Sequence, residues 1–434
     1  MNQTAGPMDR KLAGDTAWNY GAFALMAGTG VILNFFIAAY FGTAALGVFN
    51  QVYAVYIVSA QLAVFGIHDS AQKYIAQHGD DIGVSQTIAR VAVLAAAGFG
   101  IAVALLIGLT ADLIGHAADS EPVGLGVAMA APGLALFAVN KVLMGILNGE
   151  RRMRAFAIMQ GLRVLSILAF ALFVAHQGWP AYVLGAGFTV AEAIIFGPLM
   201  ILVKPWRTAG EAAEGTRLWL RRHLDFGAKA LPNGFLAESY VRVDVLMLAL
   251  FVDDTAVGIY SFAAMFIEGL YQVPVVIRTV VNPVLVKLVA AADRPAIGRF
   301  GRRIMVISLA IFIAAAGAIH LVFPHLGPYF PEGLVAGAAP VLLILTMGLG
   351  IYAAFVPLDF ILMQAGMPGR QSLLMTVNIA INAGLNLALI PSYGIQGAAM
   401  ATASAFALSA LTLNVAVWRW LPMSGGLVFG GRQG

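Results

Sequence analysis

Four basic side chains lie inside long apolar stretches of the sequence, where a charge is costly: Lys141, Arg163, Arg242 and Arg278. A charge at the centre of a bilayer costs at least about 2.5–3.5 kcal/mol, so such groups usually face a cavity or an oppositely charged partner. Lys141, Arg163 and Arg278 fall toward the same end of their segments. Together they could give a cavity a positive lining, which suits a phosphate-bearing substrate. Each alone could instead extend its charge to the membrane surface, so both interpretations stay open.

Acidic residues join these cations in one segment. Glu238 and Arg242 are four residues apart, so they share a helix face and can pair. Lining a cavity and neutralising one another are both open roles for them. Asp244 lies two residues further on, about 200° around the helix. It must therefore meet a different neighbour, and a structural bond to another helix is its simplest role.

Three asparagines follow a spacing of four residues: Asn378, Asn382 and Asn386. This spacing places them in one stripe on a helix. Asparagine in a membrane helix commonly forms hydrogen bonds with neighbouring helices. Packing and substrate contact both remain open for the stripe, and Asn378 and Asn382 are included among the candidate cavity residues.

Signals of catalysis or metal binding are weak. The chain has no cysteine, which excludes thiolate metal sites and disulfides. The pair Asp80-Asp81 has no supporting cluster of histidines or acids in the sequence. No P-loop motif occurs. We therefore predict no catalytic residue, no metal site, no resident cofactor and no ATP hydrolysis by this chain.

Composition shows which elements must position these residues. Hydrophobic residues make up 60% of the 434 residues and charged residues 11%, with a mean hydropathy of +0.87. A water-soluble protein carries roughly a quarter charged residues, so this chain is predicted to be a polytopic membrane protein. The net charge of +4 does not indicate nucleic-acid binding, because its distribution follows membrane topology.

Apolar runs long enough to span a bilayer, which takes about 20 residues, predict an all-α protein of about twelve membrane helices. The runs lie near 18–40, 44–68, 86–110, 123–147, 155–176, 181–203, 227–251, 255–280, 302–323, 333–362, 371–391 and 394–418. The polar interval 204–225 divides them six and six. It predicts an N-terminal lobe of residues 1–210 and a C-terminal lobe of residues 211–434.

Basic residues outside the helices predict the orientation. If the N-terminus is cytoplasmic, every Lys and Arg other than the four intramembrane ones falls on the cytoplasmic side. The opposite loops hold only acids, namely Asp112, Asp119, Glu121, Asp253, Asp254 and Glu332. Positive charge is retained on the cytoplasmic side of membrane proteins. We therefore expect both termini in the cytoplasm and the protein in the inner membrane of a bacterium.

The two halves also resemble each other. FGTAALGVF (41–49) follows the first predicted helix and FVDDTAVGIY (251–260) follows the seventh, while an Ala-Ala-Pro triplet opens the fourth and tenth helices. Six helices per half make the repeat parallel, related by an axis along the membrane normal, with the substrate site between the halves. The alternative is chance similarity among apolar segments.

Four stretches resemble a known family. They are Leu46-Gly47-Val48-Phe49 with FGIHDSAQKYIA (65–76), VRVDVLMLALFVDDTAVGIYSFAAMF (241–266), Asn282-Pro283, and LNLALIPSYGIQGAAMATASA (385–405). In order and helix position the set resembles the polysaccharide transporters of the O-antigen flippase type. These belong to the multidrug/oligosaccharidyl-lipid/polysaccharide exporter superfamily.

This resemblance implies a fold and a function. The fold would be two six-helix lobes in a V, as in multidrug and toxin extrusion (MATE) transporters. The function would be to flip an undecaprenyl-pyrophosphate-linked oligosaccharide to the outer leaflet by alternating access, for cell-surface polysaccharide biosynthesis. Coupling to H⁺ or Na⁺ would fall to buried acids, for which the candidates are Asp244, Glu268 and Asp359. A polysaccharide polymerase and a chain-length regulator would be partners, besides the lipid-linked substrate and membrane lipids.

Rival functions remain. A cation-coupled drug or metabolite exporter of the same superfamily would prefer an apolar, acid-lined cavity. A polytopic glycosyltransferase or polymerase would normally carry a large outer loop, and every predicted outer loop here is short. The candidate cavity residues for the flippase are Lys141, Arg163, Glu238, Arg242, Arg278, Asn378 and Asn382.

Overall fold

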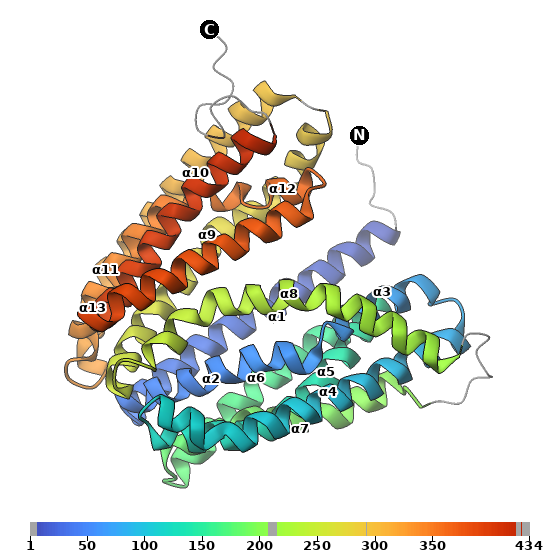
Figure 1. The fold of residues 1–434 in the computed structure, drawn as a ribbon, viewed down its shortest axis with the longest axis horizontal. Helices are drawn as coiled ribbons and strands as arrows, with labels where there is room; N and C mark the ends of the chain where they lie inside the picture. The colour runs from blue at the N-terminus through green and yellow to red at the C-terminus, as the bar shows by residue number, and fades with distance from the viewer. Residues whose placement is uncertain (1–6, 207–214, 292, 422–426, 428–434) are drawn as a thin grey trace. The chain divides into compact units, whose positions relative to one another are not determined.

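A computed structural model describes residues 7–206, 215–291, 293–421 and 427, and every regular element within these ranges is a helix (Figure 1). Helices suit a membrane because all of their backbone hydrogen bonds close within the segment. Ten of the helices in the described ranges are long and apolar enough to cross a bilayer. The predicted class, an all-α polytopic membrane protein, is confirmed.

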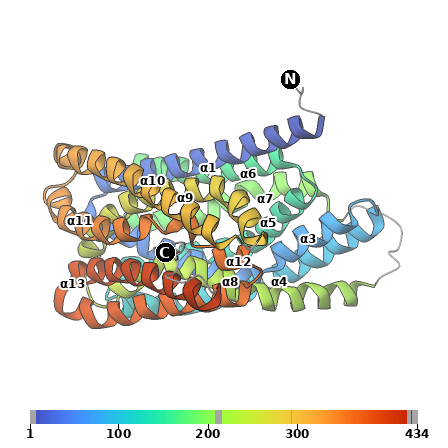
Figure 2. The same cartoon turned by 90° about the horizontal axis from the view of Figure 1, so that it is seen from above.

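The N-terminal elements run from α1 to α7. They are α1 (Pro7–Tyr40), α2 (Thr43–Val64), α3 (Ile67–His78), α4 (Ile82–Ala117), α5 (Glu121–Gly149), α6 (Met153–His176), the 3-10 turn η1 (Ala181–Gly185) and α7 (Ala186–Val203). In both views α4 and α5 lie side by side (Figure 1, Figure 2). On another side α5 packs against α7, and α5 and α2 are the two most enclosed long helices of the group.

The C-terminal elements run from α8 to α13. They are α8 (Thr216–Leu248), α9 (Asp254–Ala290), α10 (Arg294–Val322), η2 (Phe323–Tyr329), α11 (Leu334–Ala353), η3 (Val356–Leu358), α12 (Ile361–Gln364) and α13 (Pro368–Trp420). Here α11 packs against both α9 and α13.

Each of the twelve predicted segments overlaps a long helix. Two of them, 371–391 and 394–418, are the arms of α13, which bends where Gly394 leaves the helical conformation with φ 54° and ψ −132°. The predicted segment 227–251 falls within α8 and its end, although α8 is not among the ten most apolar helices. Its ionisable residues, among them Glu238, Arg242 and Asp244, lower its hydropathy.

Two predicted helices are broken. The run 333–362 was expected to be one helix, but α11 ends at Ala353 and the chain continues through η3 and α12. Pro357 lies in η3, and proline both lacks an N–H donor and restricts the residue before it. The run 44–68 is interrupted after Val64 by Phe65 and Gly66, with φ of 50° and 65°. Hydropathy alone does not reveal such breaks, because the residues on both sides are apolar.

The chain folds as two compact units. The first comprises residues 1–41 and 48–242, and the second comprises residues 42–47 and 243–434. The units therefore divide within α8, whereas the predicted lobes divide at residues 210 and 211 on the polar interval. Residues 207–214 of that interval lie outside the described part.

The first turns of α8 belong to the first unit because they pack on α3. Trp219 and His223 are fully buried there. The His223 ring lies 2.6 Å from the hydroxyl of Ser70, and the Trp219 ring lies 5.4 Å from that of Tyr74. Burial lowers the pKa of His223 from 6.5 to about 4, because a desolvated imidazole favours its neutral form. The buried histidine therefore joins α8 to α3 only while it is neutral.

We expect acidification to weaken this junction. Between pH 6.5 and about 4 the unfolded chain binds a proton that folded His223 excludes, so the free energy of unfolding falls with pH by about 3 kcal/mol in total. Above pH 6.5 His223 is neutral in both states and contributes no slope. Between pH 7.5 and pH 5, the melting temperature in detergent should fall less for His223→Gln than for the parent. The control is His116→Gln, at an exposed position, which should behave like the parent. An equal fall of the melting temperature in the parent and in His223→Gln would show that His223 is not the source of the pH dependence.

Candidate functional site

A buried ion pair crosses the first unit between α6 and α7. Arg163 Nε lies 2.7 Å from Glu192 Oε1, and Arg163 Nη2 lies 3.2 Å from Glu192 Oε2. From α5, the side-chain amide of Asn140 donates to Glu192 Oε2 over 2.8 Å. Glu192 is 2% exposed. The positive charge of Arg163 is therefore balanced inside the protein, in a geometry that uses the fork of the guanidinium group.

Aromatic rings extend from this pair. The Arg163 guanidinium lies 5.1 Å from the centre of the Phe137 ring, and Phe137 meets Tyr56 edge to face at 6.0 Å. Tyr56 in turn stacks on Phe188 at 4.8 Å. Cation–π contact and ring stacking stabilise such a row. The row links α2, α5, α6 and α7, and it fixes the position of Arg163.

The far end of this row reaches Arg242. Phe188 stacks on Tyr53 at 5.6 Å, and the Arg242 guanidinium lies 4.8 Å from the centre of the Tyr53 ring. Arg242 is half-buried. The structure thus brings Arg163 and Arg242, predicted only as separate cations, to the two ends of one aromatic row. The predicted pairing of Arg242 with Glu238 stays a prediction.

Lys141 follows Asn140 on α5 and is half-buried. It lies within electrostatic reach of the carboxylates of Glu238, Asp69 and Glu192, and also of the Arg163 guanidinium. The charges of α3, α5, α6, α7 and α8 therefore converge near Lys141. Of the predicted cavity residues in the first unit, Arg163 and Glu238 thus lie within electrostatic reach of Lys141.

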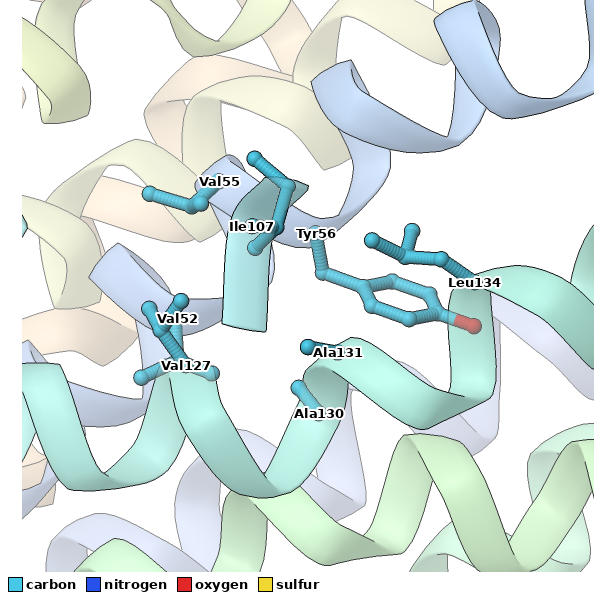
Figure 3. Close-up of a pocket in the computed structure, with 8 residues that line it drawn as sticks. All are labelled: Val52, Val55, Tyr56, Ile107, Val127, Ala130, Ala131 and Leu134. Carbon is cyan, nitrogen blue, oxygen red and sulfur yellow. The ribbon is translucent and has the colours of Figure 1, made fainter. Parts of the chain in front are cut away.

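A small apolar hollow lies beside the row (Figure 3). It is lined by Val52, Val55, Tyr56, Ile107, Val127, Ala130, Ala131 and Leu134. The hollow is too narrow for a water molecule, and its lining carries no charge. It is a packing gap between α2, α4 and α5 rather than a substrate site.

The second unit encloses Asp244 in a set of neutral hydrogen-bond donors. Tyr260 on α9 donates to Asp244 Oδ2 over 2.9 Å, and Thr402 on α13 donates to the same oxygen over 2.6 Å. Asn386, also on α13, donates to Asp244 Oδ1 over 2.8 Å. Asp244 is 8% exposed. The expected bond to another helix is confirmed, and Asp244 joins α8 to α9 and to both arms of α13.

The asparagine stripe of α13 lies on its buried face. Asn382 is 2% and Asn386 0% exposed, and the Asn386 amide donates to the side-chain oxygen of Asn382. Asn378 accepts a hydrogen bond from Thr412 over 3.0 Å. The single predicted face is confirmed, and its contacts join the two arms of α13 to each other and to α8.

A second buried ion pair joins α9 to the helix break after α11. Arg278 Nη1 lies 3.0 Å and 2.9 Å from the two carboxylate oxygens of Asp359. The Arg278 guanidinium also lies 4.5 Å from the centre of the Phe360 ring. One helical turn away, Gln364 donates to Asn282. Arg278 and Asp359, predicted for separate roles in the cavity and in ion coupling, are thus partners.

Several residues of these clusters were not singled out from the sequence. Glu192 was visible only as one acid in an apolar run, and Asn140 carried no signal beyond its polarity. Tyr260 and Thr402 stood within the stretches that resemble the family, without a role of their own. Their partners lie far away in the chain, so no local spacing connects them. Glu268, predicted for ion coupling, is exposed on α9. Among the described residues no group of three His, Cys, Asp or Glu is placed to hold a metal ion.

Comparison with known proteins gives a consistent result. Residues 12–289 match the family described as polysaccharide biosynthesis protein. A probable flippase, AglR of Haloferax volcanii, is 25% identical over 92% of this chain and 82% of its own length. Among solved structures, the lipid II flippase MurJ in an inward closed conformation has a TM-score of 0.75 at 15% identity, over 93% of this chain and 87% of its own. An inward-facing MATE transporter has a TM-score of 0.72 at 14% identity, over 89% of this chain and 92% of its own.

Proposed function

The chain belongs to the polysaccharide biosynthesis protein family, and from this premise we propose that it is a flippase for a polyprenyl-pyrophosphate-linked oligosaccharide. The observation that carries the proposal is the set of cations kept within membrane-spanning helices. Two of them, Arg163 and Arg278, are held by carboxylates, while Lys141 and Arg242 are half-buried at the edge of the polar cluster. Cations are retained in a membrane at a cost, and a pyrophosphate is the substrate group that would use them.

Aromatic and ionic contacts also support binding of the sugar. The Arg242 guanidinium lies over the Tyr53 ring, at one end of the aromatic row. Flat rings beside polar groups suit a sugar, whose surface is partly apolar and partly polar. The AglR relative is called a probable flippase and MurJ a lipid II flippase. These names support a lipid-linked substrate. A polymerase and a chain-length regulator stay predicted partners.

We further propose that Asp244 couples transport to H⁺ or Na⁺. Its carboxylate is surrounded by oxygen-bearing side chains of Tyr260, Asn382, Asn386 and Thr402. Oxygen ligands suit hard cations, and a buried carboxylate whose described hydrogen-bond partners are all uncharged is also a natural place for a proton. Transporter coupling sites lie near bent helices, and α13 bends at Gly394 between Asn386 and Thr402.

The proposed orientation keeps both termini in the cytoplasm of a cell whose cytoplasmic membrane holds the protein. Arginine and tryptophan pairs support it. Arg154 lies 5.4 Å from the Trp18 ring and Arg370 lies 5.4 Å from the Trp420 ring. Tryptophan gathers at membrane interfaces, and basic residues gather on the cytoplasmic one.

Deletion of the chain tests the proposed function. In cells that make the lipid-linked sugar, the intermediate should accumulate in the inner leaflet, where an externally added glycan-specific probe does not reach it. Re-expression should restore outer-leaflet labelling. An unchanged leaflet distribution after deletion would refute the flippase proposal.

One rival is favoured by a specific observation. The fold is also similar to a MATE transporter, and an enclosed carboxylate such as Asp244 could drive export of an organic cation. Purified protein in vesicles with an imposed ion gradient should then move a fluorescent organic cation. On the flippase proposal it should move a labelled polyprenyl-pyrophosphate sugar and leave the organic cation in place.

Replacement of Arg242 by alanine tests the cavity. We expect flux of the lipid-linked sugar to fall about tenfold or more, because a charge-assisted contact with a phosphate contributes about 1.5–3 kcal/mol. Arg221→Ala is a matched control, since that arginine is 82% exposed outside the predicted span. Both variants should insert into the membrane at parental levels. If Arg242→Ala inserts normally and transports at the parental rate, Arg242 does not contribute to the substrate cavity.

A further inference from the structure

The short helix α3 lies at the edge of the membrane. It follows the break after Val64, and its 12 residues are too few to span a bilayer. It packs against the last turns of α5 (Figure 1), where a Cβ atom on Gly145 would lie 2.6 Å from the carbonyl oxygen of His68 and one on Gly149 would lie 2.7 Å from that of Gln72. Since α5 is apolar enough to span the bilayer and ends at Gly149, the residues of α3 after Gln72 lie at the level of the lipid headgroups.

An aromatic seam, made by Tyr74, Trp219 and Phe226, joins α3 to the first turns of α8. The Tyr74 ring lies 5.4 Å from the Trp219 ring and 6.3 Å from the Phe226 ring. Lys73 Nζ lies 5.2 Å from the centre of the Tyr74 ring and 5.1 Å from that of Phe226. The Arg222 guanidinium lies 4.4 Å from the centre of the Trp219 ring. Cation–π contacts thus hold a lysine of α3 and an arginine of α8 against one seam.

The charge of these two segments is mainly positive. Together α3 and residues 216–230 of α8 hold five Lys and Arg residues and two Asp residues. Both aspartates have a partner on their own helix, a histidine at 3.3 Å for Asp69 and an arginine at 3.7 Å for Asp225. Lys73 is exposed and Arg222 is half-buried. The seam therefore offers a basic surface that is complementary to an anion.

The order of residues along α8 matches the layers of a membrane surface. Arg222 comes first, Phe226 follows one turn later, and the predicted spanning segment 227–251 comes next. Aromatic rings suit the boundary between acyl chains and headgroups. A cation one turn further out lies at the depth of the phosphates, to which basic residues next to a membrane are attracted. Lys73 lies beside the same Phe226 ring, so it reaches a similar depth from α3.

We propose that the aromatic seam between α3 and α8 binds the headgroup phosphate of an anionic phospholipid, with Lys73 and Arg222 as its two cations. Because the cations come from different helices, a bound headgroup also ties α3 to the first turns of α8. The rings beside the cations offer apolar contact to the acyl chains, which a free phosphate ion does not have. The site requires only that the protein lies in a membrane, so it does not depend on the proposed flippase activity.

Fluorescence quenching tests the site in the full chain. The chain has no native cysteine, so Gln77→Cys, at an exposed position one turn beyond Lys73, can carry a fluorophore in phosphatidylcholine nanodiscs. Phosphatidylglycerol with a spin label near the top of its acyl chain should quench it at a lower mole fraction than phosphatidylcholine with the same label. Each cation near the surface should favour the anionic lipid about fivefold. Equal quenching by the two lipids would overturn the proposal.

Paired variants separate the seam from the general surface charge. Lys73→Gln with Arg222→Gln should remove the preference for phosphatidylglycerol. Arg151→Gln with Arg154→Gln makes the same change in net charge at exposed positions between α5 and α6, and it should keep the preference. An equal loss in both pairs would show attraction to the whole basic surface and overturn the site.

Two further measurements guard against a misfolded variant and a different ligand. Lys73→Arg with Arg222→Lys conserves both charges and should keep the preference. Its loss there, at a parental melting temperature, would show that the two cations only pack the seam. Unlabelled phosphatidylglycerol should relieve the quenching. Relief by a polyprenyl diphosphate at a tenfold lower mole fraction would show a docking site for the transported lipid instead, and would overturn the phospholipid assignment.

Discussion

Asp244→Asn is expected to abolish ion-dependent flux and to leave the helices in place. The substitution keeps the size of the side chain and removes the only charge within the hydrogen-bond set of Tyr260, Asn386 and Thr402. A hydrogen bond to a charged group contributes about 1.5–3 kcal/mol, so losing the charge should weaken binding of a coupling ion at least about tenfold. Flux of labelled lipid-linked sugar into proteoliposomes, measured across a range of pH and of Na⁺ concentration, provides the measurement.

Two controls make the result specific. Thr402→Val removes one donor to Asp244 Oδ2 while keeping the carboxylate, and we expect it to shift the ion dependence without abolishing it. Asp254→Asn changes an acid outside the hydrogen-bond set, in the first turn of α9, and should leave the ion dependence unaltered. If Asp244→Asn shows the same pH and Na⁺ profile as the parent, Asp244 is a structural residue and does not couple ions.

Breaking the Arg163–Glu192 pair by a single substitution should lower the free energy of unfolding by several kcal/mol. In Arg163→Leu the carboxylate of Glu192, 2% exposed, is left without its cation, and a broken buried pair costs about 3–5 kcal/mol. Glu192→Leu leaves Arg163 in the same position and should cost a similar amount. The double variant removes both charges, and such replacements are often neutral or stabilising. Thermal unfolding in detergent of all four proteins completes a double-mutant cycle.

The same proteins separate a structural pair from a functional one. If the double variant is as stable as the parent and transports normally, the pair only packs α6 against α7. If it is stable and inactive, the pair is needed for transport. Arg278 and Asp359, at 2.9 Å in the second unit, provide a matched cycle. A double variant as unstable as the single ones would show that Asn140, which donates to Glu192, needs the carboxylate for its own burial.

The membrane class, the order of the spanning segments and the candidate charges could be predicted from the sequence because bilayer solvent acts on each segment separately. About 20 apolar residues span a membrane whatever their neighbours are, and a lone Arg163 or Asp244 in such a run is conspicuous. Spacing by four also predicted that Asn382 and Asn386 share a face, since that relation is local to one helix.

The partners of these residues depended on tertiary structure. Arg163 and Glu192 lie 29 residues apart, Arg278 and Asp359 lie 81 apart, and Asp244 and Thr402 lie 158 apart. Each pair is made by helices that pack side by side, and uniformly apolar helices carry little periodic signal to show which face meets which neighbour. The breaks at Phe65 and before Pro357 were hidden for a related reason, because an apolar run has the same hydropathy whether it is straight or bent. The sequence by itself therefore determined which charges enter the membrane, and only the packing of distant helices decided which of them neutralise one another.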